Sequence, residues 1–246
     1  MTFPRFPISF DDGQVALGVH ADPATDLPRA LRAMGLTTGV PTIVPISAGS
    51  RPAQLGRLQA LLEKVIVAVA EAVEATVVDE GERGGVGALL GQVRRRKKAG
   101  FPLLGVAPDS DGAEALDSEH THFVLVRATG DADRARWIST VATAVAGGNR
   151  SVALVAAGGE PAWESVATHV RAGRLVMAVA RSGGVADHLA AAATGRPSDA
   201  RARTLAASGQ VCAVDPARGA SSVADTVRTA LSRPNALNAG PTPSGR

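Results

Sequence analysis

Short apolar segments alternate with longer Ala-rich segments along most of this chain, and this alternation limits the folds that the chain can adopt. The apolar segments are rich in Val, Ile and Leu and lack the polar alternation of a half-exposed strand. The segments between them carry apolar residues at intervals of three and four, which predicts helices. The expected strands are residues 15–19, 42–46, 75–78, 103–107, 122–126, 152–155, 175–179 and 211–214, and residues 8–10 would pair with the first across a turn at 11–13. The expected helices are residues 53–74, 86–98, 131–146, 161–172, 185–193 and 221–231.

Continuous apolar strands that alternate with helices are typical of an α/β fold whose mostly parallel sheet is covered on both faces. We therefore predict a Rossmann-like, doubly wound fold, in a single domain over residues 1–233. A closed eight-fold barrel is the competing fold at this length, but Gly-rich loops after several strands favour the open sheet. Residues 234–246 are rich in Pro, Gly, Asn and Ser, which predicts a disordered tail.

Composition narrows the classes of function. Aromatic residues make up 3% of the 246 residues and Tyr is absent, which disfavours a protein that stacks nucleic-acid bases. The net charge is +3, and the basic run at 94–98 is interpreted as the solvated end of a helix. Cys212 is the only cysteine, and His120 and His122 lack a third ligand, so no metal site is expected. No signal peptide or apolar span is evident, and we expect a cytoplasmic protein without membrane insertion.

Four glycine-containing loops each follow an expected strand and precede an expected helix. They are residues 47–50, 80–87, 157–160 and 181–184. In an open α/β sheet, ligands bind at the carboxyl ends of the strands, where glycine lets a backbone approach a phosphate and helix amides hold the anion. Four such loops suit a ligand with a diphosphate and at least one sugar. None of them matches the P-loop, and the first strand does not lead into a GxGxxG fingerprint.

Several polar residues beside these loops have two interpretations. Asp79 and Glu80 end a strand, where they would bind a ribose hydroxyl or cap the next helix. Arg83 would bind a phosphate or extend into solvent. Glu164 lies one helical turn after Glu160, so both carboxylates would share a face near the site or simply be solvated. Trp163 is the one large ring placed to contact a base.

The loops and their flanks resemble a known family. Residues 77–87 are similar to the pattern "vvDGGTdaGvm" of prokaryotic SLOG domains, in the subgroup related to the N-terminal cytoplasmic region of melastatin-type TRP channels. Residues 101–108 resemble "fpLiGVaP", 116–126 resemble "LepnHthFvLV", 158–166 resemble "NGGeiawdEv", and 181–189 resemble "GSGRtADal". The order and spacing agree over about residues 40–195, and five segments together are more specific than any one of them.

This resemblance implies a Rossmann-like fold that binds a nucleotide-derived ligand such as ADP-ribose, with no required cofactor. The ligand-binding residues that it implies are Ala48, Gly49, Ser50, Gly81, Glu82, Arg83, Gly84, Gly85, Gly87, Gly158, Gly159, Glu160, Ser182, Gly183, Gly184 and Asp187.

Some of these positions depart from the family pattern. In the loop at residues 80–87, Glu82 and Arg83 stand where the family pattern has small residues. Glu82 would repel a phosphate unless Arg83 compensates. Arg181 replaces a family Gly, Gly184 replaces a family Arg, and Ala157 replaces a family Asn. These changes predict either a variant ligand or a loss of binding.

Three functions remain open. The first is a sensor-type protein for a nucleotide-derived ligand, acting through an effector partner in trans. The second is a nucleotide-processing enzyme such as a nucleoside-monophosphate phosphoribohydrolase, another activity of the SLOG superfamily, with Glu164 as its candidate catalytic residue. The third is a homo-oligomeric interaction module with a vestigial site.

Overall fold

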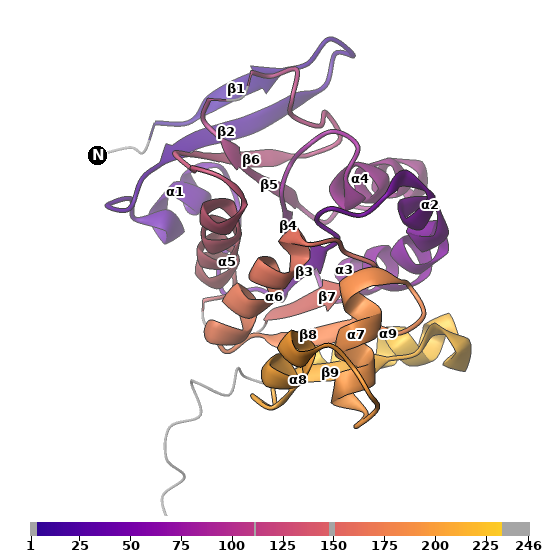
Figure 1. Cartoon of the computed structure of the whole chain (residues 1–246). Coiled ribbons are helices and arrows are strands. Elements are labelled where there is room, and N and C mark those ends of the chain that lie inside the picture. The colour runs from indigo at the N-terminus through magenta and orange to yellow at the C-terminus, as the bar shows by residue number, and fades with distance from the viewer. Residues whose placement is uncertain (1–3, 111, 148–150, 233–246) are drawn as a thin grey trace, which may run out of the picture.

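The computed structural model describes residues 4–110, 112–147 and 151–232, and within these residues nine strands form one sheet (Figure 1). The strands are β1 (Phe6–Ser9), β2 (Val15–Ala21), β3 (Thr42–Ile46), β4 (Thr76–Asp79), β5 (Leu103–Pro108), β6 (His122–Val126), β7 (Ser151–Val155), β8 (Leu175–Val179) and β9 (Val211–Val214). Their order in the sheet is β1-β2-β6-β5-β4-β3-β7-β8-β9. The sheet is open, so the competing closed barrel is wrong.

The sheet is parallel except at one edge, which confirms the predicted α/β fold. β1 pairs antiparallel with β2, with Ser9 opposite Val15, and each other neighbouring pair is parallel. The chain proceeds outward from β3 through β4, β5 and β6, and then places β7 on the opposite side of β3. The strand order therefore reverses between β3 and β7, which is where open α/β sheets form a ligand-binding crevice.

Helices cover both faces of this sheet because successive strand residues point to opposite sides. Val44 and Ile46 pack under one helical layer, whereas Ile43 packs under the other. The first layer contains α1 (Leu27–Ala33), α5 (Asp131–Ala146), α6 (Pro161–Arg171), α7 (Gly184–Ala193) and α8 (Ala200–Ala206). The second contains α2 (Pro52–Leu61), the π-helical η1 (Leu62–Val67), α3 (Ala68–Ala72), α4 (Val86–Lys97) and α9 (Ala220–Leu231). The short 3-10 turn η2 (Pro216–Arg218) precedes α9.

Three helical segments differ from the expected elements: the π-helix η1 and the short helices α1 and α8. The helix expected at 53–74 is continuous but changes to a π-helix at Leu62–Val67 and ends at Ala72. The helices α1 and α8 were not expected from periodicity, because seven residues make only two turns. Each nevertheless begins at an aspartate whose side chain accepts an amide hydrogen bond, Asp26 from Arg29 and Asp199 from Arg201. The expected tail, 234–246, lies outside the described residues.

Candidate functional site

Three of the four glycine loops meet at the carboxyl ends of β3, β7 and β8, and they are hydrogen-bonded to one another. The amide of Gly158 donates to Oγ of Ser50 at 2.9 Å, and that of Gly159 donates to the carbonyl of Ala48 at 2.8 Å. The amide of Ala157 donates to Oγ of Ser182 at 2.9 Å. These three amides are therefore satisfied within the protein, and an anion at this edge would have to use other donors.

The glycines of these loops serve close packing between loops. A Cβ at Gly159 would lie 2.5 Å from the carbonyl oxygen of Gly49, and one at Gly184 would lie 2.1 Å from that of Gly158. The first amides of α7 are also used here, since Val185 donates to Gly158 and Ala186 donates to Ala157. The loops thus form one rigid floor at the switch point.

A cavity of about 450 Å³ opens beside this floor, between the start of α2 and the loop after β8. We call it the Arg51 cavity; its lining residues are Arg51, Ala53, Gln54, Arg181, Ser182, Gly183 and Asp187. Arg51 is exposed and makes no ion pair within the part of the chain described, whereas Arg181 pairs with Asp215. Oδ1 of Asp187 is buried without a hydrogen-bond partner. The cavity therefore combines two guanidinium groups with one free acceptor.

The remaining glycine loop, residues 80–87 after β4, lies apart from these three, and we call it the fourth loop. Glu82 pairs with Arg134 of α5, and not with Arg83. Nε of Arg83 donates instead to the carbonyl of Leu116 at 3.0 Å, and its amide donates to Ala115. Arg83 therefore ties its loop to the segment before β6, and the charge of Glu82 is compensated by Arg134.

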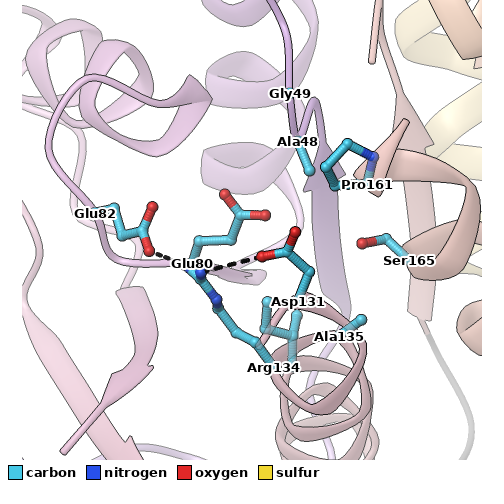
Figure 2. A pocket seen from close by; sticks show the side chains of 10 residues that line it. Ala48, Gly49, Glu80, Glu82, Asp131, Arg134, Ala135, Pro161 and Ser165 are labelled. Atoms are coloured by element: carbon cyan, nitrogen blue, oxygen red, sulfur yellow. Dashed lines mark hydrogen bonds and ion pairs between the residues drawn. The ribbon is translucent and has the colours of Figure 1, made fainter. Parts of the chain in front are cut away.

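A second, smaller cavity of about 120 Å³ lies between this fourth loop and α5 (Figure 2). We call it the Glu80 cavity; its lining residues are Ala48, Gly49, Glu80, Glu82, Asp131, Arg134, Ala135, Ile138, Pro161 and Ser165. Burial raises the pKa of Glu80; the charge of Arg134 opposes this, and the charges of Asp79 and Asp131 add to it. The cavity therefore contains an excess of carboxyl groups.

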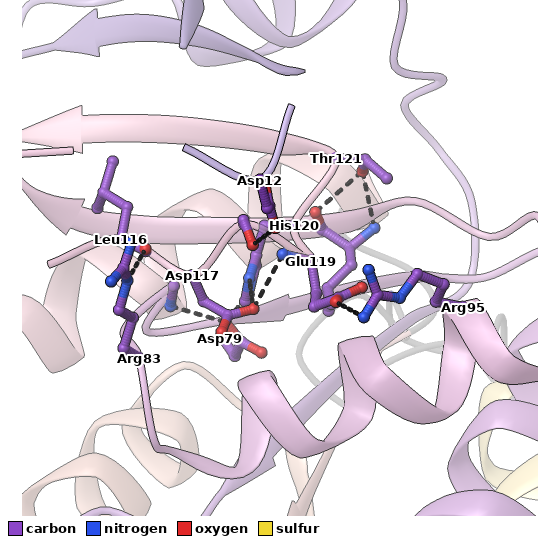
Figure 3. A network of polar contacts seen from close by, with 12 residues as sticks. Asp12, Asp79, Arg83, Arg95, Leu116, Asp117, Glu119, His120 and Thr121 are labelled. Atoms are coloured by element: carbon purple, nitrogen blue, oxygen red, sulfur yellow. Dashed lines mark hydrogen bonds and ion pairs between the residues drawn. The ribbon is translucent and has the colours of Figure 1, made fainter. Parts of the chain in front are cut away.

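Asp79, at the end of β4, contacts a buried histidine (Figure 3). Oδ1 of Asp79 accepts from the amide of Gly81 and lies 2.8 Å from Nε2 of His120. Burial alone would lower the pKa of His120, but the charge of Asp79 and hydrogen bonds to Asp117 and Asp79 raise it to about 9. His120 is thus a buried core histidine whose Nδ1 lies 3.4 Å from Oδ1 of Asp117, and the protonated ring balances the charge of the buried carboxylate.

Three further residues singled out from the sequence, Glu160, Trp163 and Glu164, lie at the start of α6, and each contacts an arginine. Glu160 pairs with Arg201, and Glu164 pairs with Arg171 at 2.6 Å. Trp163 is 8% exposed, and the guanidinium carbon of Arg201 lies 4.3 Å from its ring centroid. The ring therefore packs in the core beneath Arg201, and it does not provide the open platform for a base that we expected.

The structure also assigns residues that the sequence pattern missed. Arg51 directly follows the first glycine loop, which is the signal that could have identified it. Asp131 and Arg134 begin a helix far along the chain from the fourth loop, so only the fold brings them to Glu80. No group of three or more His, Cys, Asp or Glu side chains in the described ranges is arranged to hold a metal ion. Nor does any described helix combine the length and apolar character needed to cross a membrane.

Comparisons with known proteins place the chain in a family. The family model described as "SLOG in TRPM, prokaryote" matches residues 40–225. No curated protein matches the chain. Among solved structures, the molybdenum cofactor binding protein from Rippkaea orientalis is 14% identical, with a TM-score of 0.49 over 77% of this chain and 97% of that one. The structural-genomics target TM1055 is 19% identical, with a TM-score of 0.45 over 61% of this chain and 80% of that one. Because the family match spans well over half of the sequence, the chain belongs to the prokaryotic SLOG-in-TRPM family.

Proposed function

We propose that this protein binds a nucleotide-derived ligand of the ADP-ribose class at the switch point of its sheet. The observation that carries the proposal is the Arg51 cavity, which lies at the carboxyl ends of β3 and β8. Its position is the one at which open α/β sheets bind ligands. Membership of a SLOG family supports the same class of ligand.

The chemistry of the cavity suits an anionic group. Arg51 presents a guanidinium group that can donate two hydrogen bonds to a phosphate, and Arg181, which also pairs with Asp215, adds a second positive charge. The cavity also adjoins the first turn of α2, where the helix dipole favours negative charge. Because the amides of Ala157, Gly158 and Gly159 are already used, these side chains are the donors that we assign to the ligand's phosphates.

An apolar groove of about 480 Å³ shares Arg181 and Ser182 with the Arg51 cavity. Its walls include Leu58 and Leu61 of the second helical layer and Val223 of α9. The groove therefore adds an apolar surface beside the charged cavity.

Binding is favoured over catalysis by the position of Glu164. The phosphoribohydrolase hypothesis depends on this carboxylate, yet it pairs with Arg171 and lines neither cavity. A sensor-type role therefore accounts for more of the site than an enzymatic one.

Thermal shift and calorimetry with ADP-ribose, AMP, NAD and cyclic nucleotides test the proposal. A ligand at 100 times its Kd should stabilise the fold by about 2.7 kcal/mol. Replacing Arg51 with Gln should weaken binding by about tenfold or more, since a charge-assisted hydrogen bond is lost. Arg32→Gln is the matched control, because Arg32 is an exposed arginine of α1 that lines neither cavity. Absence of stabilisation by any of these nucleotides at millimolar concentration would contradict the proposal.

A further inference from the structure

The Glu80 cavity has the wrong charge for a phosphate. Glu80, Glu82 and Asp131 face a single cation, Arg134. That cation is already engaged, because it pairs with Glu82 and lies 3.5 Å from Asp131. An anionic group placed here would meet uncompensated carboxylate charge, so the phosphates of a ligand must lie elsewhere.

The cavity also contains acceptors without donors. Glu80 makes no hydrogen bond or ion pair within the described ranges, and Figure 2 shows its carboxyl group directed into the space beside Asp131. A narrow neighbouring pocket shares Glu80 and Glu82 with the cavity and is lined by Asp79. Asp79 is 2% exposed, and its Oδ2 has no hydrogen-bond partner. Asp79 lies outside the Glu80 cavity, so the acceptor without a donor in this cavity is the carboxyl group of Glu80. Buried acceptors are normally satisfied, so this group points to a ligand that donates hydrogen bonds.

The form of that ligand follows from size and donor type. The cavity of about 120 Å³ is large enough for a small ring and too small for a base together with a sugar. Arg134 already offsets part of the negative charge, so neutral donors suit the remaining acceptors better than a second cation. Vicinal sugar hydroxyls are such donors, and carboxylates at strand ends bind ribose hydroxyls in dinucleotide-binding folds.

We propose that the Glu80 cavity is the sugar subsite of this protein and takes the vicinal diol of a ribose, with Glu80 as the principal acceptor. This inference rests on the proposed function. One loop connects the two spaces, because Ala48 and Gly49 line the Glu80 cavity while Arg51 lines the Arg51 cavity. A single ligand can therefore place its hydroxyls on one side of this loop and its phosphate on the other.

The two glutamates of the fourth loop, Glu80 and Glu82, fit this sugar subsite. Glu80 and Glu82 stand in the segment where the family pattern has small residues, and both line the cavity. Two carboxyl groups on this loop disfavour a phosphate here and favour hydroxyl groups. The chain would therefore reject a ligand whose ribose carries a 2′-phosphate.

Calorimetry with AMP, 2′-deoxy-AMP and ADP-ribose tests the subsite on three proteins: the wild type, Glu80→Gln and Glu114→Gln. Glu114 is the matched control, because it is exposed and lines neither cavity. The wild type should bind AMP about tenfold more tightly than 2′-deoxy-AMP, and Glu80→Gln should lose this preference. Glu80→Gln should also weaken ADP-ribose by about tenfold, whereas Glu114→Gln should retain wild-type affinities.

The outcomes separate this inference from the proposed function. If the wild type binds AMP and 2′-deoxy-AMP equally, the protein still binds nucleotides but the subsite is overturned. The same conclusion follows if Glu80→Gln keeps the preference while folding normally by circular dichroism. If neither AMP nor ADP-ribose binds, both proposals fail. Stabilisation by an alkylamine and not by AMP would assign the cavity to an ammonium group and would also overturn the diol assignment.

Discussion

At the scale of single residues, Arg174 is the most unusual group in the core. Its side chain is 1% exposed, and it donates to Oγ of Ser151 at 2.9 Å and to Oγ1 of Thr143 at 2.8 Å. It also donates to Ser139 and to Nδ1 of His169, and no carboxylate in the described ranges pairs with it. Burial lowers the pKa of Arg174 to about 10 and holds that of His169 well below its usual range, so the ring stays neutral and accepts.

Arg174→Lys should therefore destabilise the protein although it preserves the charge. A lysine has three donors on one nitrogen and cannot reach the separate acceptors that the planar guanidinium spans. Leaving buried hydroxyls and a charge poorly satisfied should lower the free energy of unfolding by about 3 kcal/mol. Urea denaturation measures this change, with exposed Arg32→Lys as the control, which should stay within about 0.5 kcal/mol of the wild type. Equal stability of the two variants would contradict this interpretation.

The same scale shows why part of the site could not be predicted. His120 was correctly interpreted as a core residue, since its spacing from His122 offers no third ligand. Its partner Asp79 could not be predicted, because Asp79 lies 41 positions earlier in the sequence and only the folded sheet brings it to His120. Glu82 likewise pairs with Arg134 of a distant helix, and its sequence neighbour Arg83 contacts Leu116 instead. Local pattern identifies which residues carry charge, but only tertiary structure pairs them.

At the scale of elements, strand positions followed closely from the apolar segments because both faces of a parallel sheet are buried. The function of the loops was harder to predict, because a glycine that permits close packing and a glycine that admits a phosphate look alike in sequence. The turn between β8 and α7 illustrates this ambiguity. Arg181 occupies a left-handed conformation, with φ of 64°, at a position where the family pattern has Gly.

A pair of variants at Arg181 separates backbone strain from charge. Both Arg181→Gly and Arg181→Ala remove the guanidinium and its ion pair with Asp215, but only glycine relieves the left-handed strain. The glycine variant should therefore be more stable than the alanine variant by about 1 kcal/mol, as measured by urea denaturation. Both should lose nucleotide affinity equally if Arg181 acts through its charge. Equal stability would show that the turn carries no strain.

At the scale of the whole molecule, the Asp79–His120 pair connects β4 to the segment just before β6, and these two strands are not neighbours in the sheet. β5 lies between β4 and β6, and Gly105 of β5 pairs with Asp79 on one side and Phe123 on the other. A Cβ at Gly105 would lie 2.7 Å from Cα of Gly81, so this glycine leaves room for the contacts above it. The Asp79–His120 pair therefore links the start of the loop at residues 80–87, which we call the site-forming loop, to the segment before β6.

This link should make the stability of the fold depend on pH in the alkaline range. The groups facing His120 are Asp79 on β4 and Asp117 in the preceding loop, and together they raise its pKa from 6.5 to about 9 against the effect of burial. Below pH 6.5 the ring is protonated in both the folded and the unfolded chain, so the contribution of the pair is fully present. Between pH 6.5 and about 9 only the folded chain keeps the proton, and the free energy of unfolding falls as pH rises, by about 3 kcal/mol in all.

Urea denaturation of the wild type and of Asp79→Asn/His120→Gln, measured from pH 6 to pH 10, tests this link. The double variant removes the titrating ring together with the carboxylate of Asp79, so its stability should change little between pH 6.5 and 9, where the wild type declines. Taking the difference between the two curves cancels the titration of other groups, such as Cys212, whose thiol pKa is raised by burial. Parallel curves would mean that His120 is neutral in the folded protein, and that the site-forming loop is held by hydrogen bonds without the charge of the ring.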